Sequence, residues 1–269
     1  MSFDLKRIFG IATVVREGGL SRRRYGVPPG GPLDSESFEL AQCLVGNSLE
    51  QSALEIFGGT AELVCTKSTV LSNVGSVQGL MVDGQPRVGN SAIQVYEGEV
   101  VQVSTLGTVY LAEPGGWGVG GRGRVARLAD PPSSLRLGPI GYLPAEGFES
   151  VGRLELTINP KMSRMGIRMD GMGPLGLAEI VSEPCCVGTI QITPSGQLIT
   201  IGPDGPTLGG YPRLGYVTEV DLDRLAHVSP LARVVLDIKI YEDIELELAE
   251  RRQVRVSRCS QLRMGLETC

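Results

Sequence analysis

The sequence has almost no histidine: His227 is the only one among 269 residues. A Ser-His-Asp triad would have to use this residue, and a metal site with several histidine ligands is excluded. We expect a structural role for His227, because it falls in a predicted helix rather than in one of the glycine-rich loops. Any chemistry must therefore rest on carboxylates, arginines, hydroxyl groups and backbone amides.

Long apolar runs, paired cysteines and excess positive charge are also missing. No apolar run reaches the ~18–20 residues of a membrane span, and the N-terminus lacks an apolar signal core. The six cysteines show no C-x-x-C spacing, which predicts buried free thiols in a reducing cytoplasm. The net charge of −5 argues against a nucleic-acid partner, and the one basic cluster, Arg22-Arg23-Arg24, is interpreted as a solvated loop or a clamp for one anion. We expect a cytoplasmic protein without nucleic-acid or membrane partners.

Glycine, in contrast, is abundant: 37 of 269 residues is about twice the usual share of roughly 7%. Glycine favours turns and disfavours long helices. Apolar and polar residues alternate at 190–200, around Pro194-Ser195-Gly196, and again at 234–241, which predicts a hairpin and a strand. The sequence is therefore predicted to be mainly β.

Two short helices are predicted within this β-structure. Residues 35–45 have an apolar face at helical spacing, Asp34 as N-cap and Gly46-Asn47 as a stop signal. Residues 221–228 form the second candidate, capped by Asp221. The segment 242–252 fits both a strand and a helix, so its structure stays open.

The length allows two β lobes. We expect an N-terminal lobe with a short helix at residues 1–112, a Gly/Pro-rich connection at 113–150 and a C-terminal lobe at 151–269. Residues 118–123 fit the pattern G-x-G-x-x-G, but Pro131-Pro132 soon follows where a dinucleotide fold needs a long helix. We interpret this segment as turns.

Four segments offer groups that suit a small polar ligand. Residues 26–34 combine rigid prolines with Gly30 and Gly31, whose N–H groups near a helix start suit an oxyanion, although an ordinary turn before the helix, with Asp34 as its cap, explains them too. Arg164 and Arg168 could form an anion clamp on one strand face, or they could be ordinary surface charge. Ser182 and Glu183 could supply a base, or they could form a polar strand end. The last segment could surround a small amide or form a tight turn, and it contains Asp204, Thr207, Gly209, Gly210 and Tyr211.

These segments, in this order, resemble the family of biotin-dependent carboxyltransferases, which is also known as allophanate hydrolase subunit 2 or as the C component of 5-oxoprolinase. Residues 26–34 resemble its G-V-P-x-G-G-x-x-D loop, and residues 44–47 and 53–55 resemble its L-V-G-N and A-L-E segments. In the second half, residues 163–168 resemble S-x-R-M-G-x-R shortened by one residue. Residues 182–183, 188–191 with Gln191, and 207–212 resemble S-E, G-x-I-Q and T-T-G-G-Y-P.

The resemblance implies two related cyclophilin-like β-barrel lobes with a few short helices. It implies a partner, the subunit 1 or B of the same family, and a small amide as substrate. It further implies that ATP, with or without carboxybiotin, acts through partner subunits. From the residues themselves we expect no metal. Self-association and the substrate itself stay open.

Departures from the family pattern bear on activity. The family's Q-D-x-G-R segment is replaced by residues 15–19, and Gly205, Pro206 and Leu208 replace three polar residues of one loop. One hypothesis is an enzyme subunit in which Glu183 or Asp204 moves the proton, Arg164 and Arg168 hold an anionic group, and the glycine N–H groups bind the amide oxygen. The alternative is a degenerate binding or regulatory subunit that keeps the fold and the partner surface.

Overall fold

The computed structural model describes residues 2–123, 125–136 and 138–267. The chain divides into two compact units: the first contains Met1–Glu17, Asp34–Arg136 and Arg252–Cys269, and the second contains Gly18–Leu33 and Leu137–Arg251. These bounds differ from the expected lobes, because one early loop groups with the second half and the C-terminal segment groups with the first. This grouping depends on contacts between residues more than 100 positions apart in the sequence, and local composition does not reveal such contacts.

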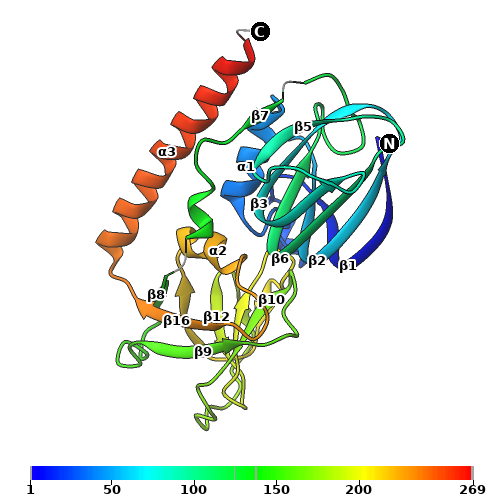
Figure 1. Cartoon of the computed structure of the whole chain (residues 1–269). Helices are drawn as coiled ribbons and strands as arrows, with labels where there is room; N and C mark the ends of the chain where they lie inside the picture. The colour runs from blue at the N-terminus through cyan, green and yellow to red at the C-terminus, as the bar shows by residue number, and fades with distance from the viewer. Residues whose placement is uncertain (1, 124, 137, 268–269) are drawn as a thin grey trace. The chain divides into compact units, whose positions relative to one another are not determined.

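The first unit is built on one antiparallel sheet with the strand order β1-β2-β6-β3-β5-β7, and β4 pairs with β3 (Figure 1). The strands are β1 (Phe3–Val15), β2 (Ala53–Cys65), β3 (Thr69–Val82), β4 (Gln85–Pro86), β5 (Ser91–Val95), β6 (Val100–Ala112) and β7 (Ala126–Arg127). The register shifts beside Gly10 in β1 and Gly58 in β2. A β-carbon on Gly10 would lie 1.5 Å from the Gly58 carbonyl oxygen, so only glycine allows the two backbones to approach this closely.

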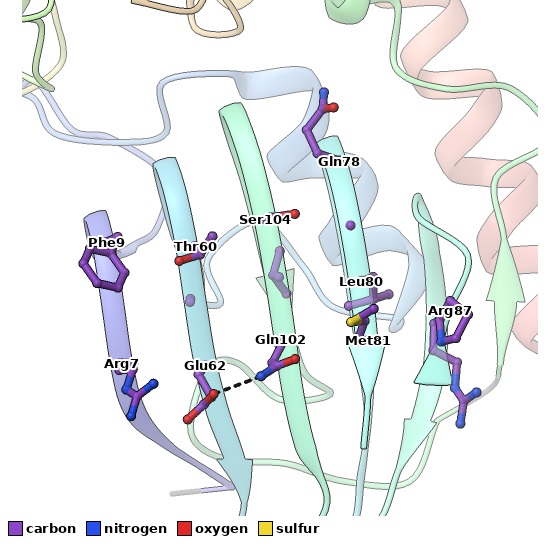
Figure 2. Close-up of a pocket in the computed structure, with 14 residues that line it drawn as sticks. Arg7, Phe9, Thr60, Glu62, Gln78, Leu80, Met81, Arg87, Gln102 and Ser104 are labelled. Atoms are coloured by element: carbon purple, nitrogen blue, oxygen red, sulfur yellow. Dashed lines mark hydrogen bonds between the residues drawn. The ribbon is translucent and has the colours of Figure 1, made fainter. Parts of the chain in front are cut away.

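Helix α1 (Ser35–Leu44) covers half of the sheet's outer face. The predicted helix at 35–45 and its cap are confirmed, because the Asp34 carboxylate accepts hydrogen bonds from the N–H groups of Glu36 (2.9 Å) and Ser37 (3.1 Å). Side chains alternate along β6, so Tyr110 and Ala112 pack under α1 while Gln102 and Ser104 lie on the same face beyond it. That second half carries an open hollow instead of a helix (Figure 2).

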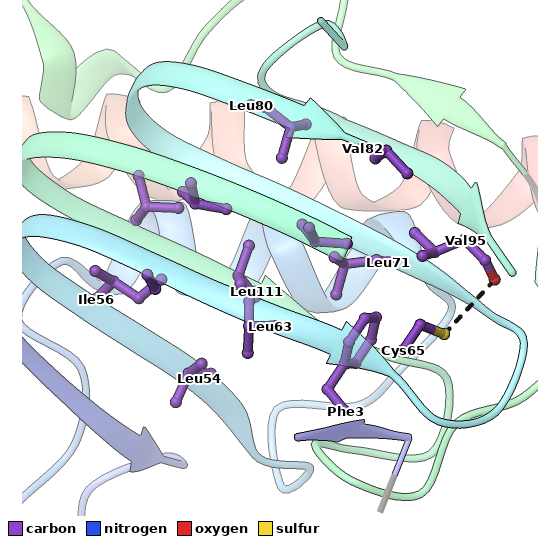
Figure 3. Packing of buried hydrophobic residues seen from close by; sticks show 14 residues of the cluster. Phe3, Leu54, Ile56, Leu63, Cys65, Leu71, Leu80, Val82, Val95 and Leu111 are labelled. Carbon is purple, nitrogen blue, oxygen red and sulfur yellow. Dashed lines mark hydrogen bonds between the residues drawn. The ribbon is translucent and has the colours of Figure 1, made fainter. Parts of the chain in front are cut away.

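The inner face of the same sheet is apolar. Its buried side chains come from β1, β2, β3, β5 and β6 and pack together (Figure 3). They include Phe3, whose ring stacks on Trp117 with 5.7 Å between the ring centroids. Trp117 follows β6, so the glycine-rich chain after this strand is fixed to the sheet rather than free to act as a linker.

The second unit is a closed barrel with the strand order β10-β13-β12-β15-β8-β16-β9. The strands are β8 (Ile140–Pro144), β9 (Leu154–Ile158), β10 (Gly166–Asp170), β12 (Thr189–Ile192), β13 (Leu198–Ile201), β15 (Arg213–Val217) and β16 (Arg233–Ile238); β11 (Glu183–Pro184) and β14 (Leu208–Gly209) form a separate two-stranded ribbon. All pairs are antiparallel except β8 with β16. The hairpin around Pro194-Ser195-Gly196 and the strand near 234–241 are confirmed.

Part of the expected connection is in fact barrel. We expected residues 113–150 to join the lobes, but β8 lies within this range and is a full barrel strand between β15 and β16. Its side chains Ile140 and Tyr142 are buried in the barrel core. The prolines and glycines on either side of this short strand concealed it in the sequence.

The other two helices also differ from expectation. Helix α2 (Glu219–Leu225) begins two residues earlier than predicted, and its cap is Thr218, whose hydroxyl accepts from the Asp221 N–H. Asp221 instead is buried and pairs with Arg224 and Lys239. The undecided tail is a 27-residue helix, α3 (Tyr241–Glu267), which is much longer than the short helices we expected.

A disulfide joins Cys43 of α1 to Cys259 of α3, both in the first unit. The expectation that all cysteines are free thiols is therefore wrong for this pair, which 216 residues separate in the sequence. Cys65, Cys185 and Cys186 are free, and Cys269 lies outside the described residues. The same end of α3 is held by ion pairs from Arg255 to Glu39 and from Arg258 to Glu36.

Candidate functional site

Most of the predicted site residues lie in the second unit. The loop Gly18–Leu33, although it comes from the N-terminal part of the chain, belongs to this unit and is tied to it by backbone hydrogen bonds. The Gly30 N–H donates to the Pro203 carbonyl (2.9 Å), and within the loop the Gly19 N–H donates to the Pro29 carbonyl (2.9 Å). Gly30 and Gly31 both have positive φ, 65° and 95°, so the loop's path depends on glycine. One of the N–H donors that we proposed for an oxyanion is therefore used by the fold itself.

Arg164 holds three segments of this unit together. It lies in a tight turn between Ser163 and Gly166, just before β10, and is only 5% exposed. Its guanidinium donates to both carboxylate oxygens of Asp204 (2.7 and 2.9 Å) and to the Gly31 carbonyl (2.8 Å). A bidentate, charge-assisted pair of this kind fixes geometry as well as charge. The structure thus brings Arg164, Asp204 and the Gly30-Gly31 loop into one cluster.

Arg168 is not part of that cluster. Its guanidinium donates to the Gln197 side chain (2.8 Å), and Gln197 in turn donates to Asp170 (2.7 Å). The expectation that Arg164 and Arg168 form one clamp on a strand is wrong, because the strand begins only at Gly166 and the two arginines bind different partners. A four-residue spacing predicts a shared face only when the whole segment is extended.

The ribbon β11–β14 forms a second cluster with Glu183 opposite Gly209. The Glu183 carboxylate pairs with Arg213, a residue that the sequence analysis did not single out. Further backbone bonds join the same two segments, from the Ile180 N–H to the Gly210 carbonyl (2.8 Å) and from the Cys185 N–H to the Thr207 carbonyl (2.9 Å). Glu183, Thr207, Gly209 and Gly210 are therefore neighbours, as the amide-site hypothesis requires.

Gln191 closes this second cluster from the barrel side. It is buried on β12, and its side-chain amide lies 3.4 Å from the Cys185 sulfur. A β-carbon on Gly209 would lie 1.9 Å from the Gln191 amide nitrogen and 2.6 Å from that sulfur, so Gly209 is required for this contact. Burial raises the pKa of the Cys185 thiol, the nearby Cys186 adds to the rise, and the charge of Arg23 opposes it.

The remaining predicted residues of this unit lie at the edge of the ribbon. Ser182 is exposed just before β11, with its hydroxyl 3.5 Å from the position that a β-carbon on Gly210 would occupy. Tyr211 is half-buried between β14 and β15. The described residues contain no group of three or more His, Cys, Asp or Glu side chains placed to hold a metal ion.

Asp34, also a predicted site residue, belongs to the first unit and has a structural role there. Its carboxylate caps α1, while its backbone N–H donates to the Tyr110 hydroxyl (2.8 Å). That hydroxyl in turn donates to Glu55 (2.7 Å). All three side chains are buried. Burial raises the pKa of Tyr110 well above its usual value, and the charges of Glu55 and Asp34 raise it further. Sequence reasoning missed Tyr110, because it reads as one more alternating residue of a strand.

The comparison with known families covers both units. Residues 25–121 and 127–237 match the family described as carboxyltransferase domain, subdomain A and B. These two segments make up most of the chain, so the chain belongs to this family.

Individual relatives are distant but cover most of the chain. It is 25% identical over 272 residues to the C component of 5-oxoprolinase from Haemophilus influenzae, covering 84% of this chain and 87% of that protein. It is also 25% identical over 293 residues to the urea amidolyase of Lachancea kluyveri, covering 82% of this chain but 16% of that protein.

Solved structures show the same fold inside longer chains. The K. lactis urea amidolyase superposes with a TM-score of 0.77 at 22% identity, over 95% of this chain and 20% of that one. The protein TTHA0988 superposes with a TM-score of 0.74 at 22% identity, over 85% of this chain and 54% of that one. The mainly β fold that we expected is therefore confirmed.

Proposed function

We propose that this chain is the carboxyltransferase-type subunit of an amide-processing enzyme, acting on a small amide such as 5-oxoproline, urea or allophanate. The observation that carries the proposal is that the barrel unit holds two clusters of the predicted site residues: Arg164 with Asp204 and the Gly31 carbonyl, and Glu183 opposite Gly209 on the ribbon β11–β14. Two of the relatives, the C component of 5-oxoprolinase and urea amidolyase, support the substrate class.

In this proposal Arg164 is a positioning residue rather than a substrate clamp. Its donors are directed at Asp204 and Gly31, so it holds the loop and the carboxylate in place. Glu183, whose side chain is 46% exposed, is the better-placed carboxylate to exchange a proton with substrate. Ser182, Thr207 and Tyr211 are proposed to orient the amide, and backbone N–H groups of the Gly209-Gly210 segment to bind its oxygen.

ATP and carboxybiotin are proposed to act through partner subunits. The phosphate-loop pattern at residues 118–123 does not fit ATP. Among the described residues it is followed by the short strand β7 rather than by a helix, and two of its N–H groups are already bonded, Gly118 to Glu113 (3.0 Å) and Gly121 to the Thr69 hydroxyl (3.0 Å). The proposal therefore assigns the nucleotide chemistry to a subunit 1 or B.

We also propose a cytoplasmic location. No helix among the described residues has both the length and the apolar character of a membrane span. The free thiols Cys65, Cys185 and Cys186 fit a reducing compartment, whereas the Cys43–Cys259 disulfide is unusual there. Alkylation of thiols in intact cells, followed by peptide mass spectrometry, reports which state Cys43 and Cys259 have in the cell.

The test is reconstitution with the cognate subunit 1 or B protein and assay of ATP-dependent 5-oxoproline hydrolysis and biotin-dependent urea carboxylation. Glu183→Gln should lower turnover at least about 100-fold, as removal of a general acid or base does. Glu179→Gln, an exposed carboxylate in the segment before β11, is the matched control and should keep full turnover. Equal turnover by both variants contradicts the role of Glu183.

One observation favours a second function, that of a degenerate binding or regulatory subunit. Both carboxylates proposed for proton transfer are ion-paired, Asp204 with Arg164 and Glu183 with Arg213. The loop between Asp204 and β14 carries Gly205 and Pro206 in place of polar family residues. If the reconstituted complex turns over neither substrate but still forms, the regulatory function is correct.

A further inference from the structure

The half of the sheet's outer face that α1 does not cover is a surface that the proposed site does not use. A hollow of about 550 Å³ lies there, and we call this surface the open face. Two rows of side chains cross it in register: Arg7, Glu62, Gln102 and Met81 in one, and Phe9, Thr60, Ser104 and Gly79 in the other (Figure 2). Gly79 has no side chain to fill the hollow, and a β-carbon at this position would lie 2.8 Å from the Ser104 hydroxyl.

The open face has the composition of a protein interface. Phe9 is 70% exposed and Met81 is 42% exposed, although large apolar side chains are normally buried. Arg7 and Arg87 stand exposed at opposite sides of the hollow. Aromatic residues, Met and Arg are the types enriched at interfaces between proteins. Helix α1 covers the equivalent side chains on the other half of this face. The side chains of the open face have no such cover, so a helix or strand of another protein could pack on them.

The charges of the open face indicate what would lie on it. Arg7 and Arg87 contribute two positive charges and Glu62 one negative charge, a local balance of +1 in a chain whose net charge is −5. Gln102 donates to Glu62 (3.0 Å), and Arg7 and Arg87 are both exposed. A complementary surface has apolar side chains at its centre and acidic groups at two sides.

Two other modes of binding fit less well. Strand addition at the neighbouring edge strand β1 is hindered, because Lys6 sits at a bulge and pairs with Asp4, and bulges and charges protect sheet edges. A small-molecule site normally has fixed, buried polar groups. The polar side chains here are exposed or half-buried instead. A broad protein contact remains the best match.

We propose that the open face is the docking surface for the partner subunit, through a patch with an apolar centre and acidic rim. This rests on the proposed function, and it specifies which surface makes the assembly. Relatives of known structure carry this fold within longer chains, of which it takes up 54% in TTHA0988 and 20% in the K. lactis amidolyase. Additional protein beside this fold is therefore common to those relatives.

The experiment measures the Kd of the full chain for its cognate subunit 1 or B protein by titration calorimetry. Phe9→Ser and the double variant Arg7→Glu/Arg87→Glu should each weaken binding at least about tenfold. Tyr96→Ser and Arg127→Glu are matched controls, because both residues are exposed in the same unit and do not line the hollow. The controls should bind like the unchanged chain, and circular dichroism melting confirms that each variant folds.

The outcomes separate the two proposals. If the unchanged chain binds and the open-face variants bind equally well, the surface proposal is wrong while the proposed function stands. If the unchanged chain does not bind at all, both fail. Light scattering of the chain alone gives one more outcome: a dimer that Phe9→Ser dissociates would show that a second copy occupies the face and would overturn the proposal.

Discussion

Replacement of Arg164 by alanine should loosen the Gly18–Leu33 loop without unfolding the barrel. The change removes two hydrogen bonds to Asp204 and one to the Gly31 carbonyl, all from a side chain that is 6% exposed. Bonds to charged groups contribute roughly 1.5–3 kcal/mol each, but the Asp204 side chain is 38% exposed, so water replaces part of the loss. We expect the free energy of local opening of the loop to fall by about 2–3 kcal/mol.

Limited proteolysis measures this opening directly, because the loop contains Arg22-Arg23-Arg24, three adjacent trypsin sites. When opening is fast relative to cleavage, the cleavage rate follows the population of the open form. A loss of about 2–3 kcal/mol then accelerates cleavage in the loop by about 30- to 150-fold. Arg164→Lys keeps the charge but loses the bidentate geometry, so its cleavage rate should lie between those of the unchanged chain and Arg164→Ala.

Arg168→Ala is the matched control for this experiment. Arg168 lies four residues away and is also hydrogen-bonded, but its partner is Gln197 and not the loop. It should leave cleavage at Arg22 to Arg24 unchanged. If Arg164→Ala and Arg168→Ala are cleaved at the same rate, Arg164 does not anchor the loop and the positioning role is refuted.

Three further predictions concern packing, protonation and the disulfide. Gly209→Ala should destabilise the barrel unit by about 1–3 kcal/mol in urea unfolding, since the new methyl group overlaps the Gln191 amide; an unchanged midpoint would contradict the close contact. Burial raises the pKa of Glu113, so the folded chain binds this proton more tightly, and the stability present below the unfolded pKa is lost as the pH rises through the folded pKa. Glu113→Gln should therefore gain stability relative to the unchanged chain as the pH rises above the ordinary glutamate pKa, and parallel pH curves would disprove this. Cys43→Ser should lower the free energy of unfolding by about 2–5 kcal/mol under oxidising conditions and abolish any effect of dithiothreitol on Tm, whereas a persisting dithiothreitol effect would show that the Cys259 bond is not its source.

Features set by neighbouring residues could be predicted from the sequence. Asp34 caps α1 because its carboxylate reaches N–H groups two and three residues ahead, and the hairpin near Pro194 follows from local alternation and a turn. The meeting of the Ser182-Glu183 segment with Gly209-Gly210 could be expected only through the family resemblance, since it joins residues 26 apart.

Features set by distant residues could not be predicted. Arg164 looked like one half of a strand clamp, but its partners lie 40 and 133 residues away. Arg213 and Tyr110 could not be identified from nearby sequence, because a strand residue gains its role only from the neighbour across the sheet. The segment 242–252 alternated like a strand while its Glu, Leu and Ala residues favour a helix, and the backbone preference prevailed over alternation in α3.

The disulfide to α3 has a consequence for the order of events during synthesis. Cys43 is made early, yet its bond must wait until residue 259 has left the ribosome. Until then the nascent chain carries an unpaired thiol on α1, and a stalled or truncated product would keep that thiol available to the wrong partner. The first unit is thus completed only after the second unit has been translated, even though its strands are translated first.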